Sequence, residues 1–234
     1  MHKINLFEDA LPAGVFRRLV RAVQAVGTER MEDMGSYSTT FWFPASAAPG
    51  NIVEESVARL CALVRPGAAC IGMEWWLGRL KYGQSLKFHS DRDRSLRKQT
   101  GQIVHPLWSS ILYLNHFPSS PTVIFDQVLS PDGNSWIPEQ PQSGKTLHAI
   151  PNHYVVFRGD LRHGVVFDPA PLPVSPDSNQ APLSSDLRLT LLINYWDRRP
   201  MPPNCRVYDG TIYPGLQSEL ATPASPRPRP RPAA

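Results

Sequence analysis

The sequence predicts a mainly β protein, an antiparallel barrel or sandwich such as a jelly roll, with supporting helices. Three observations predict it. Short runs rich in apolar and aromatic residues follow one another between residues 70 and 200, clusters of Pro, Gly, Ser and Asp separate them, and no helical pattern lies among them. Strands that follow one another without intervening helices pair antiparallel, so a barrel or sandwich is expected.

The N-terminal residues 1–68 are expected to supply the supporting helices. Apolar residues recur at helical spacing through residues 11–26, and Gly27 ends the run. We expect Asp9 to cap this helix, with Pro12 in its first turn. Such an amphipathic helix packs its apolar side against the outside of a sheet.

The next predicted elements are a short strand in residues 39–43 (TTFWF) and a second helix from Asn51 to Val64. The apolar period then changes to that of strands. The predicted strands of the barrel cover residues 74–82, 86–89, 105–117, 122–129, 145–150, 154–157, 161–167 and 187–196. The run from Asp91 to Gly101 is strongly charged and lacks an apolar period, so we expect a solvated loop or lid there.

A single domain is expected to span residues 1–221, with helical support in residues 1–68 and the barrel core in residues 70–200. The Pro- and Ser-rich stretch at 169–186 is too long for a hairpin turn, and loops of this length are often functional lids. The Pro- and Arg-rich tail, residues 222–234, cannot bury a core and is expected to be disordered. Docking of a partner through this tail is the alternative.

Composition argues against several classes of protein. The net charge of +4 comes from scattered clusters and no reading module is present, so nucleic-acid binding is not expected. No run approaches the roughly 18 apolar residues of a membrane span, and we expect no signal peptide. Three cysteines without a CxxC spacing indicate neither a disulfide framework nor a zinc site. A reducing, cytoplasmic location is therefore expected.

The first candidates for metal binding are His89 and Asp91. One residue separates them, so in an extended chain their side chains leave on the same face. One carboxylate and two imidazoles that leave positions open suit Fe(II) chemistry with a chelating co-substrate and O2. His163 is the preferred second imidazole because it opens a strand at the barrel rim, where Gly164 permits close approach. The alternatives are a surface histidine at position 89 and a core histidine at position 163.

Two further residues, Arg188 and Thr190, are candidates for binding an anionic co-substrate. They lie two apart on the predicted strand 187–196, which puts a guanidinium and a hydroxyl on the same face. A planar guanidinium with a hydroxyl beside it can clamp a carboxylate. The neighbouring side chains are apolar, so an arginine buried there needs an anionic partner. An ion pair with an internal Asp or Glu is the alternative.

Six motifs occur in order along the chain. They are Tyr82-Gly83-Gln84, His89-Ser90-Asp91, Ile111-Leu112-Tyr113-Leu114-Asn115, Thr122-Val123-Ile124-Phe125, the segment from Phe157 to Val165, and the segment from Arg188 to Trp196. In this order they resemble the 2-oxoglutarate- and Fe(II)-dependent dioxygenases, in the branch that is similar to prolyl 4-hydroxylases. The resemblance covers about residues 70–200, and the ordered set is far more specific than any single motif.

The resemblance implies a double-stranded β-helix, which is a cupin-like jelly roll. It implies Fe(II), with 2-oxoglutarate and O2 as co-substrates and ascorbate as a candidate reductant. It further implies three sets of residues: iron ligands at His89, Asp91 and His163; a pair for the distal carboxylate of 2-oxoglutarate at Arg188 and Thr190; and tyrosines lining the co-substrate pocket at Tyr82 and Tyr113.

The chain departs from the family pattern in two places. Ser119-Ser120-Pro121 stands where the family has Gly-Gly before the next strand. The stretch at 169–186 lengthens the spacing to Arg188, which leaves Arg198 and Arg199 as alternatives for the same role.

The expected activity is hydroxylation of an unactivated C–H bond of a small molecule or amino acid-like metabolite, with release of succinate and CO2. The alternatives are a peptidyl or protein hydroxylase of the prolyl type and a non-oxidative, cupin-like metal- or ligand-binding protein. Halogenation is not expected because Asp91 is present. Substrate contacts are expected from the segment 92–98, from Trp75, Trp76 and Trp108, and from the stretch at 169–186; core positions are the alternative for the tryptophans.

Overall fold

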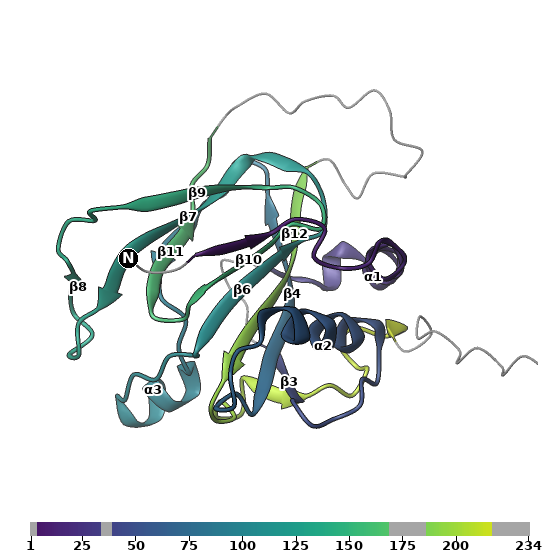
Figure 1. Ribbon diagram of the computed structural model, residues 1–234, viewed down its shortest axis with the longest axis horizontal. Coiled ribbons are helices and arrows are strands. Elements are labelled where there is room, and N and C mark those ends of the chain that lie inside the picture. The colour runs from purple at the N-terminus through teal and green to yellow at the C-terminus, as the bar shows by residue number, and fades with distance from the viewer. Residues whose placement is uncertain (1–3, 34–38, 169–185, 217–234) are drawn as a thin grey trace, which may run out of the picture.

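The computed structural model describes residues 4–33, 39–168 and 186–216 (Figure 1). The helices are α1 (Ala13–Val26), the 3-10 helix η1 (Thr28–Arg30), α2 (Ile52–Val64) and α3 (Arg94–Thr100). The strands are β1 (Asn5–Phe7), β2 (Glu32–Asp33), β3 (Thr40–Pro44), β4 (Gly72–Lys81), β5 (Leu86–His89), β6 (Trp108–Tyr113), β7 (Phe117–Leu129), β8 (Trp136–Ile137), β9 (Gly144–Ala149), β10 (Tyr154–Arg158), β11 (Leu161–Val165), β12 (Leu187–Trp196) and β13 (Cys205–Val207).

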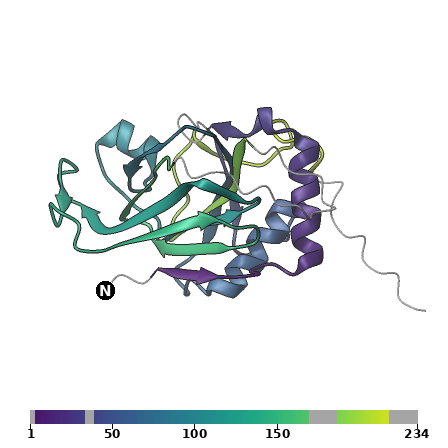
Figure 2. The same ribbon diagram turned by 90° about the horizontal axis from the view of Figure 1, so that it is seen from above.

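The described strands form two sheets. The large sheet has the order β1-β10-β6-β12-β4-β3-β13, with β2 paired to β4, and the small sheet has the order β5-β11-β7-β8, with β9 paired to β7. Nearly all neighbours are antiparallel; β13 with β3 and β2 with β4 are the parallel pairs. Figures 1 and 2 show α1 and α2 on one side of the large sheet and the small sheet on the other.

The strand β12 lies at the centre of the large sheet, and all ten of its residues are buried. Successive side chains of a strand point to opposite faces. Leu189, Leu191 and Ile193 therefore pack into the core under the helices. The intervening residues, among them Arg188 and Leu192, face the small sheet. One strand thus supplies a wall of the helix-covered core and a wall of the barrel interior.

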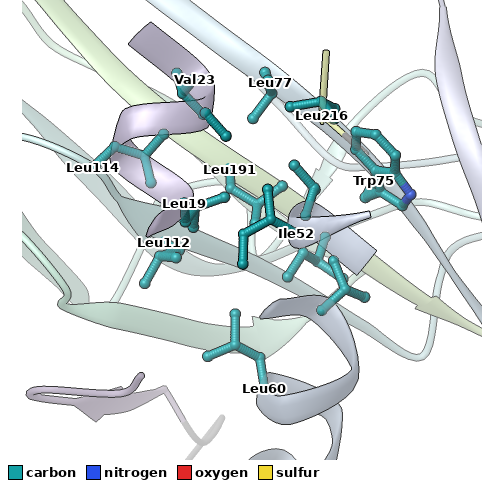
Figure 3. Close-up of a cluster of buried hydrophobic side chains, with 14 of the residues drawn as sticks. Leu19, Val23, Ile52, Leu60, Trp75, Leu77, Leu112, Leu114, Leu191 and Leu216 are labelled. Carbon is teal, nitrogen blue, oxygen red and sulfur yellow. The ribbon is translucent and has the colours of Figure 1, made fainter. Parts of the chain in front are cut away.

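The larger core fills the space between α1, α2 and the large sheet (Figure 3). The labelled side chains that gather there include Leu19, Val23, Ile52, Leu60, Trp75, Leu77, Leu112 and Leu191. Trp75 is fully buried among them, with its ring 4.8 Å from that of Phe41. Trp108 packs partly buried against the same core. These two tryptophans are core residues, and of the three candidates Trp76 alone faces the barrel interior.

The first helix begins later than predicted. Pro12 precedes its first residue without a capping side-chain hydrogen bond, and Asp9, the predicted cap, lies outside with a φ of 47°. The chain is instead held before the helix by Asn152, whose Oδ1 accepts a hydrogen bond from the Leu11 N–H. The predicted end at Gly27 is confirmed, since its φ of 88° is in the region that favours glycine.

The charged run from Asp91 to Gly101 is not a loop, and this prediction was wrong. It contains the helix α3, which Asp93 caps by accepting a hydrogen bond from the Leu96 N–H. Gly101 ends the helix in the left-handed conformation. The helix is seven residues long and nearly all of its residues touch solvent, so it carries little apolar period for the sequence to display.

The predicted strand 105–117 is also corrected. The structure has β6 over the middle of that range and starts β7 at Phe117, so Ser119-Ser120-Pro121 lies inside β7 rather than in a turn. There the register against β9 shifts between Phe117 and Thr122, a bulge that accommodates a proline without a ladder hydrogen bond. The predicted tail at 222–234 and nearly all of the stretch at 169–186 lie outside the described residues. None of the described helices is long and apolar enough to span a membrane.

Candidate metal centre

Strand pairing brings the three predicted metal ligands together. His163 on β11 is the direct cross-strand partner of His89 at the end of β5, and Asp91 follows two residues later. Asp91 Oδ1 lies 3.7 Å from His89 Nε2 and 3.8 Å from His163 Nε2. The candidate ligand atoms of all three residues lie within 4.8 Å of one another. Atoms that bind one ion at roughly 2.0–2.2 Å lie about 3 to 4 Å apart, so this donor set fits a divalent metal.

Both imidazole rings are oriented by carbonyls of their own strands. Nδ1 of His89 lies 2.8 Å from the Lys87 carbonyl oxygen, and Nδ1 of His163 lies 2.9 Å from that of Leu161. A carbonyl oxygen only accepts, so in the neutral rings Nδ1 carries the hydrogen and Nε2 keeps its lone pair. Each Nε2 therefore faces Asp91 as an available metal ligand.

The carboxylate of Asp91 is held from its other side. Its Oδ2 accepts a hydrogen bond of 2.7 Å from Ser109 Oγ on β6, and its backbone oxygen accepts one from His105 Nδ1. One carboxylate oxygen is thereby left toward the imidazoles. The sequence interpretation missed Ser109, although it stands on the same predicted strand face as Tyr113, four residues away.

Burial lowers the pKa of His163 to about 4, and the charge of His89 acts in the same direction while Asp91 opposes it. The residue is 6% exposed. A neutral imidazole is the form that binds metals, so His163 is in its binding form at neutral pH.

The close pairing of β5 and β11 depends on Gly164. A Cβ at this position would lie 2.8 Å from the Leu86 carbonyl oxygen and 3.2 Å from the Phe88 Cα. Both obstacles are backbone atoms of β5, which cannot move aside without shifting the strand that ends in His89. The sequence-based expectation that Gly164 permits close approach agrees with this geometry.

We therefore expect Gly164→Ala to lower the free energy of unfolding by about 1–3 kcal/mol and to weaken Fe(II) binding. Urea unfolding of the metal-free protein and Fe(II) titration measure the two effects. Gly14→Ala is the matched control. Gly14 lies in α1, and a Cβ at this position would meet nothing within 4 Å. The free energy of unfolding of this control is expected to rise by about 0.5–1 kcal/mol, because alanine favours the helix more than glycine does. Unchanged stability and metal affinity in Gly164→Ala would contradict the steric argument.

The predicted anion-binding arginine lies beside the same space. Arg188 is fully buried, its Nη2 donates a 2.6 Å hydrogen bond to Thr122 Oγ1, and its guanidinium lies 5.2 Å from the centre of the Tyr113 ring. The Tyr113 hydroxyl donates to the same Thr122 oxygen at 3.0 Å. Thr122 and the three metal-ligand candidates line one hollow in the interior between the two sheets. The sequence placed Thr122 in a motif but assigned it no role.

The other two predicted co-substrate residues differ in position: Thr190 is the cross-strand partner of Tyr113 on β6, whereas Tyr82 lies beyond the end of β4. Thr190 Oγ1 donates to the Gly78 carbonyl oxygen at 3.3 Å, within the pairing of β12 and β4. Tyr82 lies one residue beyond the end of β4, is 44% exposed, and packs edge-on against Phe167 at 5.3 Å. It is not among the residues that line the hollow beside the metal-ligand candidates. The fallback Arg198 is exposed and pairs with Asp197.

Comparison with solved structures places the fold. EctD from S. alaskensis, in its apoform, is 13% identical and superposes with a TM-score of 0.51 over 89% of this chain and 79% of that chain. The chain has a double-stranded β-helix fold. This confirms the predicted fold class, and at such identity the likeness concerns the fold alone.

Two other structures that resemble this double-stranded β-helix have lower scores. A prolyl-4-hydroxylase from Pseudomonas putida is 18% identical over 85% of this chain and 89% of that chain, with a TM-score of 0.48. HygX from Streptomyces hygroscopicus, with nickel and 2-oxoglutarate bound, is 13% identical over 83% of each chain, with a TM-score of 0.46. No protein-family model and no curated protein matches the sequence.

The interior of the double-stranded β-helix contains a hollow of about 460 Å³, counted out to its opening. His89, Asp91 and His163 stand on one part of its wall. Apolar side chains make up much of the rest, among them Trp76, Ile111, Phe157 and Leu192. An apolar enclosure of this kind keeps water away from a polar centre and strengthens the electrostatic interactions within it.

A carboxyl group of the double-stranded β-helix, that of Glu74, also has a shifted pKa. Burial raises the pKa of Glu74 on β4 to about 7, although hydrogen bonds from Thr40 and Trp196 oppose the shift. Glu74 is 9% exposed. The folded state therefore favours the protonated form, so this group stabilises the fold at low pH and loses that contribution as pH rises from about 4.5 to about 7.

We expect Glu74→Gln to remove this pH dependence. The amide is neutral at every pH, and it can still accept from Trp196 and donate to Thr40. Relative to the wild type, the variant should gain stability as pH rises, by up to about 3 kcal/mol at pH 8, and show little difference near pH 4.5. Urea unfolding of both metal-free proteins at several pH values measures the difference. A difference that does not vary with pH would contradict the raised pKa.

Proposed function

We propose that this protein is an Fe(II)- and 2-oxoglutarate-dependent dioxygenase. In this proposal it hydroxylates an unactivated C–H bond of a small molecule or amino acid-like metabolite and releases succinate and CO2. The observation that carries the proposal is the meeting of His89, Asp91 and His163, two imidazoles and one carboxylate, at one point of the barrel interior. Thr122 is on the wall of the same hollow, and the buried Arg188 donates a hydrogen bond to it, which supports binding of a dicarboxylate co-substrate nearby.

The three residues would hold the metal, with Nε2 of each imidazole and Oδ1 of Asp91 as ligand atoms. Fe(II) bound there supplies the O2 chemistry of hydroxylation, with 2-oxoglutarate as the co-substrate that is oxidised. Ser109 keeps the second oxygen of Asp91 occupied as a hydrogen-bond acceptor. The carbonyls of Lys87 and Leu161 keep both rings in the tautomer that binds metal.

Residues on the wall of the hollow and directly behind it would position and enclose the co-substrate. The Arg188 guanidinium is fixed by Thr122 and by the Tyr113 ring, so little side-chain entropy is lost when a carboxylate binds it. Trp76, Phe157 and Leu192 are apolar walls of the hollow that the metal-ligand candidates line, and they would limit the water that reaches it.

The test is succinate formation by the purified full chain, reconstituted with Fe(II) without oxygen and then supplied with 2-oxoglutarate and air. Succinate is expected at a slow rate without substrate and at a higher rate with a suitable one, and ascorbate is expected to prolong turnover. Both rates should require Fe(II) and 2-oxoglutarate. Tight Fe(II) binding without any succinate, with or without candidate substrates, would favour the non-oxidative metal-binding alternative.

A mass increase of about one oxygen identifies the product. Its appearance on a free metabolite supports the small-molecule proposal. Its appearance on a peptide, with no modified metabolite, would replace that proposal with a peptidyl hydroxylase.

A further inference from the structure

A second hollow, of about 360 Å³, adjoins the first and shares Asp91 and Trp76 with it. The pairing of β4 with β12 gives the order of the side chains along the barrel. Arg188 stands opposite Leu80, Leu192 opposite Trp76, and Asn194 opposite Glu74. Leu192 belongs to the wall of the first hollow, and Asn194 and Glu74 belong to that of the second. The second hollow therefore lies toward one end of β4 and β12, and Arg188 lies toward the other end. The hollow that the metal-ligand candidates line is between them.

The inner wall of this second hollow carries a buried acid. Glu74 accepts hydrogen bonds from Thr40 Oγ1 at 2.5 Å and from Trp196 Nε1 at 2.9 Å. Within the described ranges it forms no ion pair. A buried carboxyl group without a cation destabilises a fold, whereas an apolar residue would fill the same interior position at no such cost. Acids kept in this way gather at functional sites.

The other charges of the second hollow have different positions. Asp93 accepts hydrogen bonds from the N–H groups of Leu96 and Met201, so its carboxylate holds α3 in place. Arg92 is half-buried and Arg94, the first residue of α3, is exposed, and both line the hollow. The hollow thus has an acid on its inner wall and guanidinium groups toward solvent.

We propose that the second hollow binds the substrate, and that Glu74 selects one with a cationic nitrogen while Arg92 and Arg94 face an anionic group of the same molecule. The substrate class is then a zwitterionic, amino acid-like molecule with a side-chain amine or guanidine. The inference rests on the proposed dioxygenase function and adds to it the chemistry of the substrate. A ligand cation beside Glu74 would supply the ion-pair partner that this acid does not have among the described residues.

A purely structural role for Glu74 makes a different prediction. If the carboxyl group only ties Thr40 to Trp196, its replacement changes stability but not the choice between a cationic ligand and its neutral isostere. The decisive measurement is therefore a ratio between two ligands on the same protein, which a general loss of folding or of metal does not alter.

The experiment uses two isosteric pairs, arginine with citrulline and lysine with 6-hydroxynorleucine, and agmatine as the analogue of arginine without its carboxylate. Each compound is tested for stimulation of succinate formation by the Fe(II)-loaded full chain. Binding to the Mn(II)-loaded protein with 2-oxoglutarate is measured separately by calorimetry. We expect the cationic member of at least one pair to be favoured about tenfold or more, and agmatine to be weaker than arginine.

In Glu74→Gln the preference for the cationic member should fall to about threefold or less. Glu54→Gln is the matched control: Glu54 is also 9% exposed, and burial also raises its pKa, but it lies on α2 and not on the hollow. This control should keep the preference of the wild type.

Three results would overturn the inference: equal response to both members of each pair, an unchanged preference in Glu74→Gln, or no response to any compound while substrate-free succinate formation persists. Absence of succinate under every condition would instead refute the dioxygenase function, and the calorimetric preference would still decide whether the hollow selects cations.

Discussion

Replacing Asp91 with alanine is expected to lower Fe(II)-dependent succinate formation by more than about a hundredfold. Changes to residues that merely orient a metal ligand cost about 10–100-fold in affinity or activity, and Asp91 is a candidate ligand itself. Its loss also leaves the two imidazoles without a carboxylate beside them. Succinate is measured by chromatography, and bound iron by a colorimetric assay after gel filtration.

Asp126→Ala serves as the control for the Asp91 variant. Asp126 is an acid of the same barrel, but its carboxylate accepts exposed hydrogen bonds from Gln142 and Ser143 and does not line the hollow of the metal-ligand candidates. Wild-type iron content and turnover are expected there. If Asp91→Ala kept both its iron and its turnover, the metal centre would have to be sought elsewhere in the chain.

Replacing Arg188 with methionine is expected to raise the KM for 2-oxoglutarate by about a hundredfold or more. Removing one partner of a buried, hydrogen-bonded charge pair costs about 2–5 kcal/mol, and a hundredfold change corresponds to about 2.8 kcal/mol, within this range. Arg188→Lys should give a smaller rise, because it keeps the charge but loses the planar fork that Thr122 holds. Initial rates of succinate formation against 2-oxoglutarate concentration give both KM values.

The control for Arg188 is Arg198→Met, which also tests the alternative candidate from the sequence. Arg198 is exposed and paired with Asp197 beyond the end of β12, so its loss should leave the KM unchanged. The opposite pattern, a raised KM in Arg198→Met and a normal one in Arg188→Met, would move the co-substrate site. Because Arg188 is buried, the unfolding temperature of each variant is recorded beside its KM.

The sequence predicts most of the strands because their burial is regular. The strand 187–196 is found with the predicted bounds. All of its residues are buried, most of them are apolar, and Pro, Ser and Asp residues before it mark where it begins. Elements with mixed exposure are where prediction failed. The helix α3 has one buried residue, Ser95, so no apolar period marks it. In β7, the sequence Ser119-Ser120-Pro121 predicts a turn, but in the structure it forms a bulge within a longer strand.

The candidate metal ligands could be predicted because two of them are neighbours in sequence and the third lies in a recognisable turn-and-strand pattern. Residues that act across strands could not. Ser109 on β6 donates a hydrogen bond to Asp91. Thr122 on β7 accepts one from Arg188, and Glu74 on β4 accepts one from Trp196. Serine, threonine and glutamate in strands carry no signal of their own, and only the register of the sheets shows what each one meets.

The orientation of the two imidazoles has a consequence for which metal the protein acquires. Each ring is held by a carbonyl of its own strand, so the nitrogen donors are in place before any ion arrives. A site of nitrogen and oxygen donors binds first-row divalent metals with affinity that rises from manganese through iron and nickel to copper. Coordination alone then does not select iron. Metal supply in the cell would determine which ion occupies the site, and nickel, copper or zinc would act as inhibitors that compete for it.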